Sequence, residues 1–308
     1  MRGVEGLVSE VEALKRRLRA VILAHNYQLP EVQDIADFVG DSLGLARKAV
    51  ESGADVIVFA GVSFMAEMAA VLNPDKVVLH PNPCAGCPLA NYLSPQRVRE
   101  VRSEIPNTPI VLYVNSLTRA KVEADYVVTS ASAAKLISRL GEEVVVFGPD
   151  RNLADHVSTV TGKHVLPLPP HGHCPVHEYL LNEYYVAKAL AENPGAKLIA
   201  HPETPRKVRA IAHAIGSTSQ MLEKIKEING KVILATEEGL TYRARKLYPS
   251  RAKEIIPANP LAVCVDMKKI TLMDVLRSLK LMKHRVRVDP EVARRAREVI
   301  ERSLEIIK

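Results

Sequence analysis

Val21-Ile-Leu-Ala-His25-Asn-Tyr27 is the first of three similar stretches in this chain. The other two are Ile110-Val-Leu-Tyr113-Val-Asn115 and Leu198-Ile-Ala-His201-Pro-Glu203. Each is a short apolar run that ends in polar groups, and equivalent residues stand 88 positions apart: first His25, Tyr113 and His201, then Tyr27, Asn115 and Glu203. Such a fixed interval indicates an internal repeat, and a repeat determines how the rest of the sequence is interpreted.

Two further features keep the same interval. A serine or threonine stands 17 positions after His25, Tyr113 and His201. These hydroxyl residues are Ser42, Ser130 and Thr218. A second apolar run then ends at Phe59, Phe147 and Ala235. Several independent features at one gapless interval are difficult to obtain by chance, so we predict three structurally equivalent units.

Each unit alternates apolar strands with helical stretches. Continuous apolar strands separated by helices are typical of a parallel sheet that is covered on both faces. We therefore expect an α/β fold of three repeated parallel-sheet domains, at residues 1–87, 88–175 and 176–265. Helices are predicted over 95–104, 177–192 and 272–281, and the C-terminal helices of 266–308 are expected to pack back on the first domain.

Three similar domains can close around a pseudo-threefold axis. Ligands of open parallel sheets bind beyond the carboxyl ends of the strands, where the polar residues of every copy lie. This pattern favours a single active site at the junction of the three domains. The alternative is three separate domains, each with its own surface.

Composition excludes several classes of protein. The formal net charge is +7, but aromatic residues make up 4% of the 308 residues, and no basic run is interleaved with aromatics that could stack on bases. The charge is more typical of solvated helix faces, and it would also attract small anionic substrates. No run of eighteen apolar residues and no secretory signal occurs, so we expect a cytoplasmic enzyme that binds neither nucleic acid nor membrane.

Each unit ends with a cysteine after its fourth predicted strand: Cys87 or Cys84, Cys174, and Cys264. One thiolate ligand from the equivalent position of each repeat would suit a metal centre on a shared axis. Thiolates are soft ligands, which favour iron–sulfur clusters, zinc or copper(I). Spacing slightly favours Cys84 as the first ligand, whereas the Cys-Pro step that Cys87 shares with Cys174 favours Cys87.

Three equivalent cysteines would leave one iron of a [4Fe–4S] cluster without a protein ligand. Most four-iron clusters use four cysteines. An open iron can polarise a substrate oxygen as a Lewis acid, which is dehydration chemistry and not electron transfer. The alternative is a zinc site that includes His171, His173, Cys174 and His177, but one Cys-x-x-Cys beside a group of histidines is a weak zinc motif.

Ser42, Ser130 and Thr218 stand where helices are predicted to begin. A hydroxyl at a helix N-terminus, with its exposed backbone N–H groups, can bind a carboxylate or phosphate. The alternative is ordinary N-capping, which serine and threonine perform in many proteins.

Nine motifs together resemble the quinolinate synthase family from about residue 20 to the end of the chain. The motifs are Ala24-His-Asn-Tyr-Gln28, Gly40-Asp-Ser42, Cys87-Pro-Leu-Ala-Asn91, Tyr113-Val-Asn115, Phe147-Gly-Pro-Asp-Arg-Asn152, Gly172-His-Cys-Pro-Val-His177, His201-Pro-Glu203, Gly216-Ser-Thr218 and Ala262-Val-Cys264. The resemblance implies three α/β domains around one [4Fe–4S] cluster, held by Cys87, Cys174 and Cys264. It implies condensation of iminoaspartate with dihydroxyacetone phosphate to quinolinate, phosphate and water, in NAD biosynthesis.

The resemblance also implies roles for single residues. The substrate site would be lined by His25, Ser42, Tyr113, Asn115, Ser130, His201, Glu203 and Thr218. From the residues themselves, we predict Glu203 as the general base, with Tyr27 and Tyr113 as proton donors. His25 and His201 are candidates for hydrogen bonding a substrate carboxylate and for shuttling protons near neutral pH. Like charge from an anionic substrate would raise the proton affinity of Glu203.

Several alternatives stay open from the sequence. They are another hydro-lyase that uses a three-cysteine cluster, a non-enzymatic cluster or electron-transfer protein, and a zinc-binding module. A partner enzyme that supplies iminoaspartate is compatible with the sequence.

Overall fold

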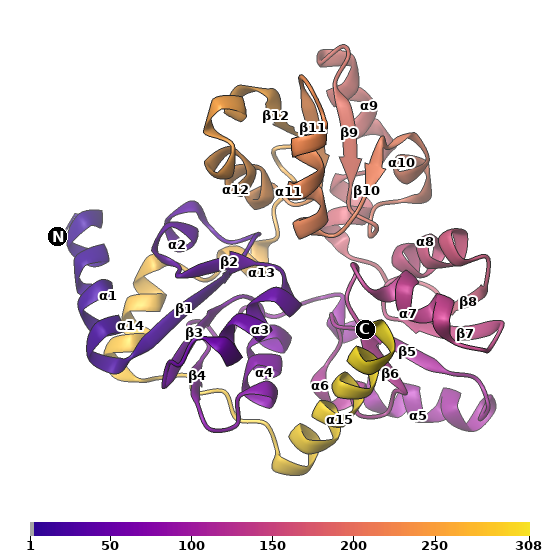
Figure 1. Cartoon of the computed structure of the whole chain (residues 1–308), viewed down its shortest axis with the longest axis horizontal. Helices are drawn as coiled ribbons and strands as arrows, with labels where there is room; N and C mark the ends of the chain where they lie inside the picture. The colour runs from indigo at the N-terminus through magenta and orange to yellow at the C-terminus, as the bar shows by residue number, and fades with distance from the viewer. Residues whose placement is uncertain (1–2) are drawn as a thin grey trace. The chain divides into compact units, whose positions relative to one another are not determined.

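The computed structural model describes residues 3–308, apart from the side chains of Leu43, Ala46 and Arg47, and within these residues it contains three four-stranded sheets (Figure 1). The chain separates into two compact units. The first unit is the chain up to Cys87 together with Cys264–Ala293, and the second unit is Pro88–Val263 together with Arg294–Lys308. The first unit therefore contains one sheet and the second unit two.

The sheet of the first unit has the order β2-β1-β3-β4, with all neighbours parallel. Its strands are β1 (Ala20–His25), β2 (Phe38–Gly40), β3 (Val56–Ala60) and β4 (Val77–Leu79). The helices of this unit are α1 (Val4–Leu18), α2 (Pro30–Ile35), α3 (Ser42–Glu51), α4 (Ser63–Leu72), α13 (Val265–Lys268) and α14 (Leu272–Leu281).

The first sheet of the second unit has the equivalent order β6-β5-β7-β8, again parallel. Its strands are β5 (Ile110–Tyr113), β6 (Tyr126–Val128), β7 (Val144–Gly148) and β8 (His164–Pro167). The helices associated with it are η1 (Ala90–Tyr92), α5 (Pro95–Glu104), α6 (Thr118–Lys121), α7 (Ala133–Arg139) and α8 (Arg151–Thr161).

The second sheet of this unit repeats the order once more, as β10-β9-β11-β12. Its strands are β9 (Lys197–Ala200), β10 (Ala214–Ile215), β11 (Val232–Ala235) and β12 (Ile255–Pro257). The associated helices are η2 (Val176–Leu180), α9 (Glu183–Glu192), α10 (Arg206–Ile211), α11 (Thr218–Glu227), α12 (Gly239–Leu247) and η3 (Pro249–Glu254).

The strand order is the same in all three sheets, and this confirms the predicted α/β class with three repeated parallel sheets. The inner strands are buried on both faces. β3, for example, reads Val-Ile-Val-Phe-Ala and each of its residues is buried. Helices cover both faces of such a sheet, so its strands carry continuous apolar runs and not an alternating pattern.

Helix α14 lies in the first unit, and most of the last helix lies in the second unit. α14 packs on α1 in the first unit (Figure 1). α15 (Pro290–Ile307) instead contacts the second repeat: Ser303 Oγ accepts a 2.8 Å hydrogen bond from Val127 N on β6. We expected this helix to pack on the first domain. It bonds to the second repeat because Ser303, on its buried face, accepts a hydrogen bond from a backbone N–H of the second sheet.

The helix predicted over 177–192 is broken into two. A π-helical turn, η2, comes first, and α9 begins after Asn182, whose side chain accepts hydrogen bonds from Tyr184 N and Tyr185 N. Asparagine is a strong N-cap and starts a new helix at this point. π-helical turns are rare and occur frequently at functional sites.

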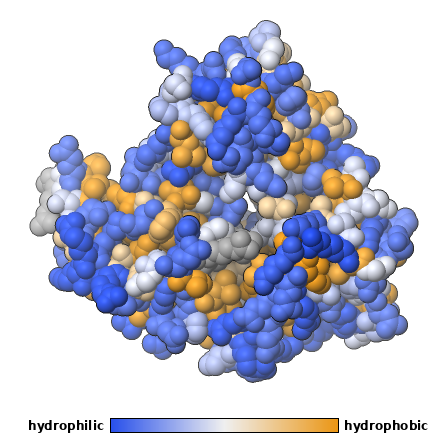
Figure 2. All heavy atoms as spheres, viewed as in Figure 1, coloured by the Kyte–Doolittle hydropathy of each residue, from blue (hydrophilic) through white to orange (hydrophobic). Residues whose placement is uncertain are grey.

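Hydrophilic side chains cover most of the face drawn in Figure 2. Between them lie small apolar areas, as is ordinary for a protein surface. No helix among residues 3–308 is long and apolar enough to cross a membrane.

An ion pair between Arg209 and Asp155 joins α10 to α8. Arg209 on α10 is 6% exposed, and its Nη2 lies 2.6 Å from Asp155 Oδ2 on α8. Burial lowers the pKa of the neighbouring His156 to about 4, and the Arg209 guanidinium acts in the same direction. Folding therefore holds this imidazole neutral.

We predict that His156 makes the protein less stable in mild acid. The unfolded chain binds a proton at His156 near its ordinary pKa of about 6.5, whereas the folded chain does so only near 4. Stability is therefore complete above pH ~6.5 and falls as the pH drops towards 4. His156→Gln should flatten this part of the pH dependence of the unfolding free energy, measured by urea denaturation. His164→Gln, at an exposed position on β8, is the control, and an unchanged profile for His156→Gln would contradict the prediction.

Candidate active site

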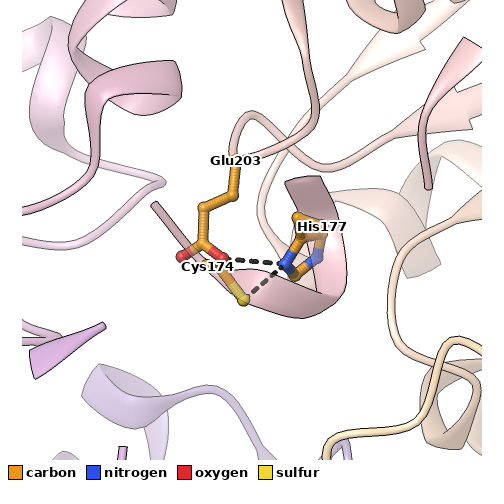
Figure 3. A group of neighbouring side chains, drawn as sticks. All are labelled: Cys174, His177 and Glu203. Carbon is orange, nitrogen blue, oxygen red and sulfur yellow. Dashed lines mark hydrogen bonds and ion pairs between the residues drawn. The ribbon is translucent and has the colours of Figure 1, made fainter. Parts of the chain in front are cut away.

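Three side chains of the second unit meet in a compact group (Figure 3). Cys174 lies in the loop after β8, His177 follows three residues later in η2, and Glu203 lies in the loop after β9. His177 Nδ1 is 2.9 Å from Glu203 Oε2 and 3.2 Å from Cys174 Sγ. His177 and Glu203 are almost fully buried, at 1% and 3% exposure. A thiol, an imidazole and a carboxylate thus converge on one point.

Glu203 has further polar neighbours. Tyr113, at the end of β5, hydrogen-bonds to its carboxylate, and Asn115 Nδ2 lies 3.5 Å from Glu203 Oε1. Burial alone would raise the pKa of Glu203, but His177 foremost, with His201 and Tyr113, lowers that pKa to about 2. The carboxylate is therefore ionised at neutral pH. The structure brings together four of the predicted site residues: Tyr113, Asn115, His201 and Glu203.

The second ring nitrogen of His177 is also occupied. His177 Nε2 lies 3.1 Å from Thr236 Oγ1, directly after β11. The ring is thus held from both sides. Sequence reasoning placed His177 only in the zinc alternative and missed Thr236. The Cys174-x-x-His177 spacing, which puts both side chains on one turn, is the signal that could have found His177.

Asp150 fixes the loop that carries Cys174. This fully buried carboxylate accepts hydrogen bonds from Leu153 N, at 2.7 Å, and from Cys174 N, at 3.0 Å. Burial raises the pKa of Asp150 well above its ordinary value, and the Glu203 charge raises it further. A Cβ at Gly172 would meet Pro149 O at 2.0 Å, so only glycine fits where the two loops touch. Asp150 had no role from sequence, and these contacts give it one.

Asn152 connects the same segment to Glu203. Its Nδ2 donates to the backbone carbonyl of Glu203, at 3.0 Å, and to Glu178 Oε2, at 2.7 Å. Glu178 also pairs with Arg151, at 2.5 Å. The Asp150-Arg151-Asn152 motif therefore positions both the Cys174 loop and the Glu203 loop.

In the first unit, His25 and Tyr27 reproduce the local geometry of His201 and Glu203. Tyr27 N donates to His25 Nδ1 at 3.2 Å, and Glu203 N donates to His201 Nδ1 at 3.4 Å. In both copies the histidine is buried. Because Nδ1 faces a backbone N–H in both copies, Nε2 is the ring nitrogen that is directed elsewhere. The repeat therefore preserves the histidine conformation while the residue two positions later changes.

The hydroxyl residues do not cap their helices. Asp41 caps α3 by accepting from Gly44 N, and Ser217 caps α11 in a reciprocal pair with Gln220. Ser42 and Thr218 are the first residues inside these helices, and Ser130 precedes α7. The capping alternative is therefore wrong for Ser42 and Thr218, because Asp41 and Ser217 cap their helices. Ser130 is not the cap of α7 either, since the N-cap position of that helix is Ser132.

The cysteines are distributed over both units, and none of the four forms a disulfide. Cys87 and Cys264 belong to the first unit and Cys174 to the second. In the first unit, Asn82 Nδ2 donates to Lys269 O at 2.8 Å, and Lys269 Nζ donates to Cys84 O at 3.0 Å. These bonds join the segment that leads to Cys87 to the segment that follows Cys264. Cys84 is exposed, whereas the other three are partly buried.

The zinc alternative needs a different set of ligands. Among the residues that the structure describes, the His, Cys, Asp and Glu side chains close enough to share one ion are Cys174, His177 and Glu203. His171 and His173 are outside this group, and His173 Nδ1 hydrogen-bonds to the carbonyl of His171 at 2.7 Å. The group can bind a cation or transfer protons between a buried carboxylate and its neighbours.

Comparison with known proteins agrees with the resemblance of the motifs. A family model described as Quinolinate synthetase A protein matches residues 9–305. The quinolinate synthase of Pyrococcus furiosus is 52% identical over 307 residues, which cover 99% of this chain and 100% of that protein. The quinolinate synthase of Thermotoga maritima is 46% identical over 303 residues, 98% of this chain and 100% of that protein. The chain belongs to the quinolinate synthase family.

Proposed function

We propose that this protein condenses iminoaspartate with dihydroxyacetone phosphate to give quinolinate, phosphate and water, for NAD biosynthesis. Family membership supports the reaction. The observation that carries the assignment of the site is the buried, ionised Glu203 carboxylate, which contacts Tyr113, Asn115 and His177. Under this proposal, the active site lies at the junction of the three domains around a pseudo-threefold axis.

Both substrates are anions, so the site needs donors for carboxylate and phosphate oxygens. We assign this role to Ser42 and Thr218, because Asp41 and Ser217 perform the capping beside them, and to Ser130, because it stands at the equivalent place of the repeat. His25 and His201 would add imidazole donors through Nε2, since a backbone N–H occupies Nδ1 of each ring. The net charge of +7 would attract these substrates to the protein.

Glu203 is assigned as the general base. It would take a proton from a substrate carbon, which leaves an enamine carbon as the nucleophile for condensation. His177 lowers the pKa of Glu203, whereas a bound anionic substrate would raise it towards the range useful for a base. Tyr113 and Tyr27 would supply protons to oxygen, and Asn115 would orient the substrate.

The cysteines fit the iron–sulfur cluster that the family implies. Cys87, Cys174 and Cys264 form no disulfide, are partly buried, and each follows the last strand of one sheet. Thiolates are the usual cluster ligands. We propose that these three hold one [4Fe–4S] cluster, whose fourth iron, when the cluster is bound, supplies a Lewis acid for dehydration.

The first test of this function is anaerobic purification with iron and sulfide analysis and a quinolinate assay. The wild-type chain should contain about four irons and form quinolinate. Ser substitutions at Cys87, Cys174 and Cys264 should each abolish the cluster, because each removes a ligand. Cys84→Ser, the matched control, should retain it. A cluster that disappears in Cys84→Ser but remains in Cys87→Ser would reverse the choice of ligand, and dehydration of an unrelated substrate without quinolinate would indicate another hydro-lyase.

Glu203→Gln should retain the cluster and bind quinolinate, but its turnover should fall on the order of 10²–10⁴-fold, because the amide keeps the shape and cannot accept a proton. Steady-state assays and product titration measure the two effects separately. Glu183→Gln, at an exposed position in the same domain, is the control. Near-normal turnover of Glu203→Gln would remove this residue from the mechanism.

Ser42→Ala, Ser130→Ala and Thr218→Ala should each weaken substrate binding by about 1.5–3 kcal/mol, the value of a hydrogen bond to a charged group. The matched control is Ser217→Ala, which removes a helix cap. It should lower the unfolding free energy by about 0.5–2 kcal/mol and leave substrate binding unchanged. If Thr218→Ala lowers only the stability and Ser217→Ala weakens substrate binding, Thr218 would be the cap and Ser217 the substrate ligand, and the assignment would be wrong.

A further inference from the structure

We infer that Cys174, His177 and Glu203 form a site for a single Zn²⁺ ion, with a ligand set different from the three-cysteine set proposed above. The three ligand atoms lie within 4.8 Å of one another. A thiolate, an imidazole and a carboxylate are all common zinc ligands, and three protein ligands with a water in the fourth position are typical of an open zinc site. All three residues belong to the second unit.

The distances require only a small adjustment. With ordinary zinc bond lengths, tetrahedral geometry separates sulfur from nitrogen by about 3.6 Å and nitrogen from oxygen by about 3.3 Å. The observed separations from His177 Nδ1 are 3.2 Å to Cys174 Sγ and 2.9 Å to Glu203 Oε2. An ion bound between these atoms would move the ligands apart by a few tenths of an ångström.

The surroundings of the group are those of a metal site. A metal-binding histidine usually donates its other ring N–H to an oxygen, which fixes the ring and the tautomer. Thr236 Oγ1 is placed to accept from His177 Nε2, at 3.1 Å. Asp150 holds the backbone N–H of Cys174, and Asn152 holds the carbonyl of Glu203. Each ligand is therefore positioned by a second residue.

The same geometry argues against a nucleophilic triad. In a triad, the histidine contacts its nucleophile through one nitrogen and the carboxylate through the other. Here His177 directs Nδ1 towards both Cys174 and Glu203, while Nε2 faces Thr236. A ring nitrogen that faces a sulfur and a carboxylate oxygen together suits a shared cation.

Zinc in this site would exclude the iron–sulfur cluster, because both would use Cys174; this consequence rests on the proposed function. It would also remove Glu203 from proton transfer. The protein without its cluster would then bind Zn²⁺ at one ligand of the cluster, and zinc would have to leave before cluster assembly.

The test uses a full-length chain in which Cys84, Cys87 and Cys264 are replaced by Ser. Four cysteines occur in the sequence, so Cys174 is then the remaining thiol. Co²⁺ is the spectroscopic probe, since a thiolate bound to it gives a charge-transfer band in the near ultraviolet. Competition by Zn²⁺ then reports the affinity for zinc.

We expect one Co²⁺ per chain, displaced by Zn²⁺. His177→Ala and Glu203→Gln in this background should weaken binding by on the order of 100-fold or more, and Thr236→Val by about 10-fold, because it removes only the supporting acceptor. His173→Ala, the matched control, should bind normally. Far-ultraviolet circular dichroism verifies folding, and His177→Gln replaces His177→Ala if the latter is unfolded. No band, or a band that His177 and Glu203 substitutions leave unchanged, would overturn the site.

The competition is tested separately by reconstituting the cluster in the wild-type chain with and without Zn²⁺. Zinc should block cluster uptake, and a chelator should restore it. If zinc and the cluster bind together while zinc still depends on His177, the zinc site stands, and the assignment of Cys174 to the cluster fails. Loss of quinolinate formation alone would affect the proposed function and not the zinc site.

Discussion

The charge on Glu203 is the constraint on which the second unit depends. An ionised carboxylate in a protein interior is costly unless hydrogen bonds and opposite charge compensate it. Its partners come from three separate segments: Tyr113 and Asn115 after β5, His177 in the turn η2, and His201 at the end of β9. The fold therefore has to hold the ends of two sheets and one π-helical turn in a fixed relation, and removing one partner would leave a buried charge.

A second buried acid, Asp150, supports the first in a different way. Burial and the charge of Glu203 raise the pKa of Asp150, whereas His177 and other neighbours lower the pKa of Glu203. Asp150 uses its two oxygens for backbone N–H groups, including that of Cys174, and so acts on the shape of a loop. Two carboxylates in one region thus differ through their surroundings: Glu203 is held ionised by its neighbours, and Asp150 holds the backbone N–H of Cys174.

The three repeats keep a backbone and change its chemistry. The loop after the first strand of each sheet carries His25 and Tyr27, Tyr113 and Asn115, or His201 and Glu203. The backbone N–H two residues after each histidine donates to its Nδ1, so the histidines keep one conformation in both copies. Parallel sheets collect such loops at one edge, which allows a repeated unit to supply a hydroxyl, an amide and a carboxylate at equivalent places.

The sequence by itself determined the fold class and its repetition. Apolar runs such as Val56–Ala60 and their 88-residue interval depend on local side-chain pattern, which periodicity reports directly. The helices over 95–104 and 272–281 were predicted with the observed bounds. It also predicted Glu203 as a candidate site residue. Only the tertiary structure decided which residues surround Glu203, that Asp41 and Ser217 and not their neighbours cap the helices, and that α15 bonds to the second sheet. His177 and Thr236 are 59 residues apart, and a hydrogen bond between such distant residues has no periodic signature; it exists because packing of the strands and the turn η2 brings the two side chains together.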